Sequence, residues 1–187
     1  MKSKKIVFVG TPSTGVSTFL YRVYCGAFPE IIRPTYSEAL ITFTECDGET
    51  VELQLWDTPC QEDYDAIRPL IYPGTDVFVI CYSFLKPDSM DEIASRWYPE
   101  IISHCEKATI IVLGLRNSNI NAEIPEIVKR FLSSHDRPHY IADSFTGNGI
   151  DLFLVDVARL GIDPLYLIKM KKAMDRQRKL PKNFCRI

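Results

Sequence analysis

Residues 6–20 read IVFVGTPSTGVSTFL, in which an apolar run is followed by a turn and then by apolar residues at helical spacing. The run at residues 6–9 predicts a short buried strand that ends at Gly10. Apolar residues at positions 19, 20 and 23 predict a helix over residues 16 to about 26. Strand, loop and helix in this order are typical of an α/β fold.

The same alternation continues along the chain. It predicts strands at residues 40–46, 51–56, 76–82, 109–113 and 139–142, and helices at residues 89–104, 124–132 and 150–160. Asp47-Gly48 is a strong two-residue hairpin signal, so one strand is expected to be antiparallel. We therefore expect an α/β fold with a mostly parallel six-stranded sheet, one antiparallel strand and helices on both faces.

The 187 residues are 46% hydrophobic and 25% charged, and no stretch approaches the roughly 20 apolar residues that span a bilayer. One soluble domain is expected. The six cysteines stand singly without a CxxC pair, so neither a zinc site nor a disulfide framework is predicted. The first residues carry no signal-peptide pattern, and the composition as a whole predicts a cytoplasmic protein with free thiols.

Charge is distributed unevenly along the chain. Residues 164–187 hold eight basic residues and one acidic residue, a net +7, whereas residues 1–163 carry a net −9. We expect a globular domain at 1–163 and a basic tail at 164–187. The acidic body disfavours nucleic acid, while the tail suits either an anionic membrane face or solubility alone. Residues 165–179 are equally compatible with a short amphipathic helix and with coil.

The loop GTPSTGVS at residues 10–17 is close to the phosphate-binding pattern GxxxxGK[ST]. In that pattern backbone amides and a helix N-terminus hold phosphates, a lysine bridges them, and the hydroxyl binds magnesium. Here Val16 stands in place of the lysine, and Pro12 removes one backbone donor. On this motif alone, an ordinary strand–turn–helix connection is an equally good interpretation.

A second motif, WDTPCQEDYD at residues 56–65 followed by RPL at 68–70, resembles the second switch of Rho-family small GTPases. Pro34-Thr35 resembles the first switch, Ala27-Phe28-Pro29 the segment that flanks the base, and RWYPEI at 96–101 a helix of the family. The resemblance covers nearly all of residues 4–163. It implies the P-loop small G-protein fold, with GTP or GDP and Mg²⁺ as ligands.

The resemblance also implies roles for individual residues. Ser17, Thr35 and, through water, Asp57 would bind magnesium, and Gln61 would position the attacking water. The nucleotide-binding set would comprise Gly10, Ser13, Thr14, Gly15, Val16, Ser17, Thr18, Phe28, Thr35, Asp57, Cys60, Arg116, Ser118 and Ser144. A surface for effector or regulator proteins would comprise Glu38, Tyr64, Arg68, Leu70 and Trp97.

Several positions depart from the family pattern. Cys60 replaces the glycine whose amide meets the γ-phosphate, and Ser118 replaces the aspartate that reads guanine. These changes predict damaged switching and weak base specificity, with Asp143 an open candidate for partial rescue. Residues 119–138 leave room for one helix, so the insert helix of Rho proteins is expected to be absent. Differences around the first switch imply that the usual Rho effectors need not bind.

The last residues also depart from the family. Cys185 is third from the end rather than fourth, so standard prenylation is not expected. Any contact with the inner membrane face would then be peripheral and carried by the basic tail.

Two functions stay open at this point. The losses at positions 16, 60 and 118 favour a pseudo-GTPase with weak or lost GTP binding and hydrolysis, which acts in signalling or cytoskeletal regulation through protein–protein contacts. The retained magnesium and water-positioning residues favour a working guanine-nucleotide switch with slow GTPase activity. A third interpretation gives the pocket another phosphate ligand, because Ser118 relaxes the choice of base.

Overall fold

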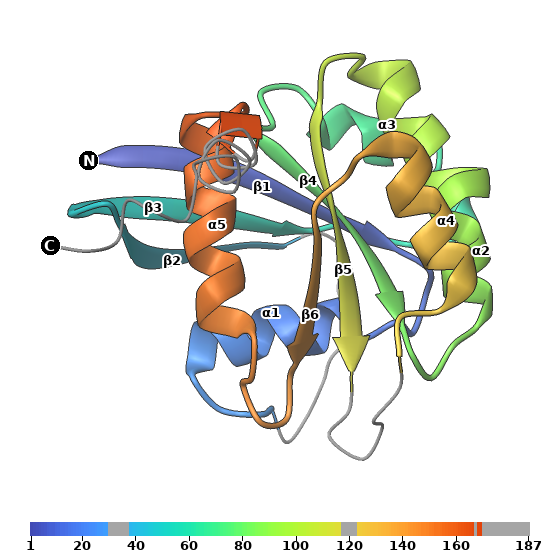
Figure 1. Cartoon of the computed structure of the whole chain (residues 1–187), viewed down its shortest axis with the longest axis horizontal. Helices are drawn as coiled ribbons and strands as arrows, with labels where there is room; N and C mark the ends of the chain where they lie inside the picture. The colour runs from blue at the N-terminus through green and yellow to red at the C-terminus, as the bar shows by residue number, and fades with distance from the viewer. Residues whose placement is uncertain (30–37, 117–122, 167, 170–187) are drawn as a thin grey trace, which may run out of the picture.

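The computed structural model describes residues 1–29, 38–116, 123–166 and 168–169. Within these residues the chain forms a six-stranded sheet in the order β2-β3-β1-β4-β5-β6 (Figure 1). Its strands are β1 (Lys2–Gly10), β2 (Glu38–Cys46), β3 (Glu49–Asp57), β4 (Val77–Ser83), β5 (Thr109–Arg116) and β6 (His139–Asp143). All neighbouring strands are parallel except β2 and β3. The predicted sheet is therefore confirmed.

The helices lie on both faces of this sheet. Helices α1 (Val16–Cys25) and α5 (Ile150–Ile162) cover one face, and α2 (Asp88–Glu92), α3 (Tyr98–His104) and α4 (Glu126–His135) cover the other (Figure 1). Because side chains alternate along a strand, β1 serves both layers. Its even-numbered apolar residues pack with α1 and α5, and its odd-numbered ones pack with α3 and α4.

β1 is longer than the apolar run at 6–9 predicts. It begins at Lys2 and pairs with β3 from Lys2↔Val51 onward. The first four residues of the strand are polar, so a search for apolar runs passes over them. The hairpin after β2 is as expected, with Asp47 and Gly48 both at positive φ, 53° and 83°.

The single helix predicted at residues 89–104 is wrong in detail. α2 passes into a π-helical turn, η3 (Ile93–Trp97), before α3 begins. Pro99, in the first turn of α3, has no N–H to donate to the carbonyl of Ser95, so the α-helical ladder is broken at this point. The turn buries both Ile93 and Trp97 against the sheet.

Some predicted features lie outside the described residues: Thr35, Ser118 and the tail from residue 170 onward. Between residues 123 and 138 the described chain holds α4 as its helix. None of the helices in the described ranges is long and apolar enough to cross a membrane.

Phe153 of α5 is central to the core beneath α1 and α5. Its ring is fully buried and lies 6.2 Å from Phe8, 5.5 Å from Phe19 and 5.7 Å from Tyr140, centroid to centroid. Three elements of the fold therefore meet on one side chain.

We expect Phe153→Ala to lower the free energy of unfolding by about 3–5 kcal/mol, because it removes buried aromatic area and leaves a cavity. The matched control is Leu152→Ala, whose side chain is 63% exposed, with an expected change within about 0.5 kcal/mol. Urea unfolding followed by circular dichroism measures both. Equal losses in the two variants would contradict this account of the core.

Candidate functional site

The loop from Gly10 to Ser17 joins β1 to α1 and has an unusual backbone. Ser13 has φ 66°, rare for a residue with a Cβ, and Gly15 has φ 94° immediately before α1. A Cβ on Gly10 would lie 2.9 Å from the carbonyl oxygen of Cys81, so only glycine fits where β1 meets β4. The loop is thus shaped by three special positions.

Two cavities open beside this loop. One, of about 290 Å³, is lined by Thr11, Ser13, Thr14, Gly15, Val16, Ser17, Thr18 and Cys60. The other, of about 220 Å³, is lined by Ser13, Thr14, Gly15, Thr18, Phe28, Ser83, Leu85, Leu115, Arg116, Ser144 and Phe145. Most of the predicted nucleotide-binding residues are therefore brought together at the carboxyl ends of parallel strands, where ligands bind in open α/β sheets.

Ser17 and Asp57 lie against each other in this region. The Ser17 hydroxyl donates to Oδ2 of Asp57 across 2.6 Å, and the Asp57 carboxyl is buried at the end of β3. Both side chains offer hard oxygen ligands of the kind that Mg²⁺ prefers. The arrangement fits a magnesium site with these two residues on one side.

The phosphate side of the loop lacks the family's lysine. Val16 is only 4% exposed and belongs to the core cluster, so it replaces a charge with an apolar contact. A different cation reaches the loop, because Nζ of Lys86 donates to the carbonyl of Pro12 across 2.7 Å. Sequence reasoning missed Lys86, since it follows β4 and matches no motif.

The cavity around Phe28 is partly closed by a second aromatic ring. Phe145 lies 5.4 Å from Phe28, edge to face, and both rings are exposed. Asp143 does not line this cavity. Its Oδ1 accepts the backbone N–H groups of Phe145 and Thr146, at 2.9 and 3.0 Å, so the carboxylate holds the loop that carries Phe145. The sequence places Phe145 in a candidate base-side loop at residues 143–145 but assigns its ring no role.

Cys60 has little freedom in this structure. Its thiol donates to the carbonyl of Thr58 across 3.2 Å, and burial raises its pKa to about 12, so it is a neutral thiol at pH 7. The carbonyl of Cys60 accepts a hydrogen bond from Arg96 at 3.3 Å, and that of Pro59 accepts one from Arg68 at 3.0 Å. The segment that should swing in a switch is tied down at two successive carbonyls.

The predicted partner surface needs correction at two residues. Arg68 and Trp97 are both fully buried, so neither is available to a partner. The Arg68 guanidinium is buried while it donates to both oxygens of Glu100, at 2.9 and 2.6 Å. The guanidinium groups of Arg68 and Arg96 also lie 4.8 and 4.5 Å from the centre of the Trp97 ring. Leu70 and Ile67, nearby, are exposed at 77% and 53%.

The buried network extends to the phosphate-binding loop. The indole Nε1 of Trp97 donates to Oγ1 of Thr11 at 3.4 Å, and the Thr11 hydroxyl donates to Glu92 at 2.8 Å. Glu92 also pairs with Arg96 at 3.4 Å. The loop, the second switch and the helix after β4 therefore form one hydrogen-bonded unit.

The remaining predicted residues are placed as follows. Gln61 is exposed immediately before the short 3₁₀ helix η1 (Glu62–Tyr64), and Tyr64 is half-buried. Glu38 is the first residue of β2.

A strand, a phosphate-binding-type loop, a magnesium-type Ser–Asp pair and a second switch define the class of small G proteins. Comparison with known families agrees, because a model of the Ras family matches residues 5–134. The chain belongs to the Ras family. It is similar to the GTP-binding protein RHO1 of Candida albicans (strain SC5314 / ATCC MYA-2876), with 41% identity over 114 residues. That match covers 61% of this chain and 58% of the relative, and it confirms the Rho-type resemblance.

Arg68→Met tests the buried network. Removing the arginine leaves the largely buried carboxylate of Glu100, 14% exposed, without its cation, and the expected loss is about 3–5 kcal/mol of unfolding free energy. Arg130→Met is the matched control, because Arg130 is exposed on α4 and should change stability by less than about 0.5 kcal/mol. Thermal and urea unfolding measure both, and an Arg68→Met variant as stable as Arg130→Met would refute the network's role.

Proposed function

We propose that this protein is a Rho-like signalling protein that acts mainly through protein–protein contacts, with weak or lost GTP binding and hydrolysis. The observation that carries the proposal is the cavity beside Val16, which has no cationic side chain among its described lining residues. A nucleoside triphosphate would bring several negative charges to the cavity beside Val16. Without a bridging cation, binding relies on backbone amides and magnesium alone.

Magnitudes support the same interpretation. A charge-assisted hydrogen bond contributes about 1.5–3 kcal/mol, so loss of the lysine and of the guanine-reading aspartate would weaken nucleotide binding by roughly 10²–10⁴-fold. The hydrogen bonds to the carbonyls of Pro59 and Cys60 support the same interpretation, since Arg68 and Arg96 hold this part of the second switch with protein groups. Ser17 and Asp57 would hold Mg²⁺ if a nucleotide brought it, and the ion would then neutralise phosphate charge.

A working switch is the second candidate, and Lys86 is the observation that favours it. Its ammonium group already lies at the loop carbonyl of Pro12, so a bound phosphate would compete with that carbonyl for the same cation. In this alternative Gln61 would position water for slow hydrolysis.

The partner side of the proposal rests on the exposed face of the second switch. Tyr64, Ile67 and Leu70 give this face apolar and aromatic character above the buried Arg68 network. We assign residues 1–163 to the G domain and 164–187 to a basic tail. The tail would add weak contact with anionic membrane to a cytoplasmic protein.

Nucleotide content tests the proposal. The purified protein should release no stoichiometric GDP or GTP on acid extraction, and titration with a fluorescent GDP analogue should give a dissociation constant no tighter than micromolar, with or without magnesium. Co-purified nucleotide, or submicromolar magnesium-dependent binding, would replace the proposal by the working switch.

Restoring the two missing charges tests whether their loss is the cause of weak nucleotide binding. We expect Val16→Lys together with Ser118→Asp to strengthen binding of the GDP analogue by at least about tenfold. The control pairs Val16→Met with Ser118→Asn, which adds similar bulk without charge. Lys86→Met should bind the GDP analogue as the parent protein does, whereas weaker binding by Lys86→Met would support the second candidate. If the charged double variant binds the GDP analogue no more tightly than the parent protein, loop geometry rather than missing charge is the cause of weak binding.

Membrane contact by the tail is tested with a variant in which Gln replaces five basic residues: Lys171, Lys172, Arg176, Arg178 and Lys179. The variant should sediment less with vesicles that contain anionic lipid, since each basic residue contributes about 1 kcal/mol near such a surface. Folding should be unchanged by circular dichroism. Undiminished sedimentation would discard membrane contact by the tail.

A further inference from the structure

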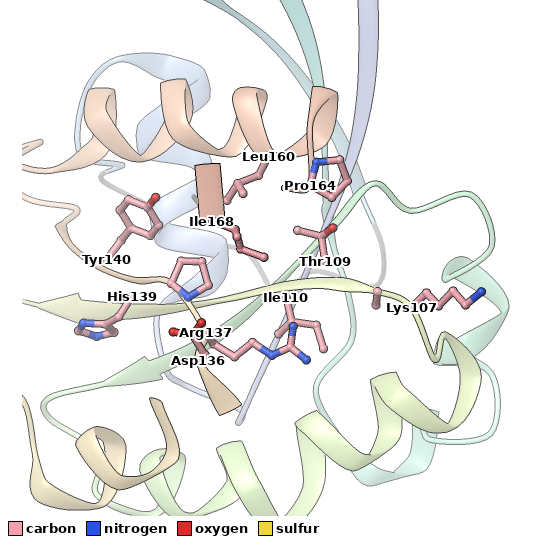
Figure 2. Close-up of a pocket in the computed structure, with 12 residues that line it drawn as sticks. Lys107, Thr109, Ile110, Asp136, Arg137, His139, Tyr140, Leu160, Pro164 and Ile168 are labelled. Carbon is pink, nitrogen blue, oxygen red and sulfur yellow. The ribbon is translucent and has the colours of Figure 1, made fainter. Parts of the chain in front are cut away.

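A larger cavity lies at the other end of the sheet, remote from the phosphate-binding loop. It encloses about 500 Å³ and is lined from the start of β5, the turn before β6, the end of α5 and the segment after α5. Its lining shares no residue with either cavity beside the loop. Figure 2 shows its side chains on both sides of the β5 ribbon, with Leu160, Pro164 and Ile168 on one side and Ile110 and Arg137 on the other.

The cavity exists because β6 begins late. The first register pair between β5 and β6 is Val112↔His139, so residues 109–111 of β5 have no strand beside them on that side. The N–H of Val112 still donates to the carbonyl of Pro138 across 2.9 Å. Pro138 has no N–H to continue the ladder toward Ile110, so the proline keeps this edge open.

One end of the cavity is cationic. Arg137 follows the left-handed Asp136 that ends α4, and it makes no ion pair with any described carboxylate. Among the described residues, its guanidinium donates one hydrogen bond to the hydroxyl of Tyr98, at 3.2 Å, and lies over the Tyr98 ring. Its Nε is buried without an acceptor among the described residues. A guanidinium half-buried on an acidic domain with so few acceptors is incompletely satisfied.

The other end is apolar. Leu160 is nearly fully buried in its wall, and Ile168, on the same side of β5, is 45% exposed. The charged lining residues are Lys107, Arg137 and Asp136, which together give a net charge of +1 at pH 7. His139 is neutral there, because burial lowers its pKa to about 4.

We propose that this cavity binds a soluble small molecule with a monoanionic carboxylate head and a short aliphatic body. The head would pair with Arg137, whose planar fork matches a carboxylate, and the body would lie against Leu160 and Ile168. A net charge of +1, with Asp136 in the wall, disfavours a phosphate dianion. The site is independent of nucleotide, so its failure would not affect the function proposed above.

The probe is decanoate, titrated to millimolar concentration into the full chain with isoleucine methyl groups labelled for NMR. We expect saturable shifts at Ile110 and Ile168, with decanol and decyl phosphate each binding at least about tenfold more weakly. Arg137→Gln should weaken decanoate binding at least about tenfold, while Arg130→Gln, an exposed control on α4, should not. If Arg137→Gln does not fold, the test uses Ile168→Trp instead. The larger side chain fills the cavity and should abolish the decanoate-induced shifts.

The proposal would be overturned by equal affinity for decanoate and decanol, or by the absence of a saturable shift at Ile110 and Ile168. It would also be overturned if Arg137→Gln bound decanoate as tightly as the parent protein, or if Ile168→Trp still bound it. Tighter binding of decyl phosphate than of decanoate would also overturn it, because the charge argument for a monoanion would then be wrong.

Discussion

The buried guanidinium of Arg68 is the constraint on which the site depends. A cation in the interior is tolerated only when it is fully hydrogen-bonded and neutralised. Here Glu100 meets it from α3 with both oxygens, and Pro59 meets it with a backbone carbonyl. Because these partners come from different segments, satisfying one charge fixes the position of the second switch against α3.

That fixed position extends through Trp97 to the loop from Gly10 to Ser17. The indole contacts two guanidinium groups and donates to Thr11 in the loop. In a nucleotide-operated switch, the γ-phosphate provides the energy that orders such segments. Here Arg68 and Arg96 hold the carbonyls of Pro59 and Cys60, and Cys60 places a half-buried neutral thiol where the family pattern has a glycine.

Much of the fold was predictable from the sequence, because periodicity and turn signals report directly on burial. The strand at 76–82 and the Asp47-Gly48 hairpin are examples. The π-helical turn was not, since Pro99 looks at sequence level like a tolerated first-turn proline. For the site, motif matching found the loop and the Ser17–Asp57 pair but placed Arg68 and Trp97 on the surface. Their burial depends on Glu100 and Thr11, contacts distant in sequence that no motif encodes.

Amide hydrogen exchange of residues 60–72 tests the central claim most directly, measured with magnesium at millimolar GDP, at millimolar non-hydrolysable GTP analogue and without nucleotide. We expect the same slow exchange in all three conditions, because the Arg68 network holds this segment whether or not nucleotide is present. Faster exchange with GDP than with the GTP analogue would contradict the account and would show that the second switch still responds to the γ-phosphate.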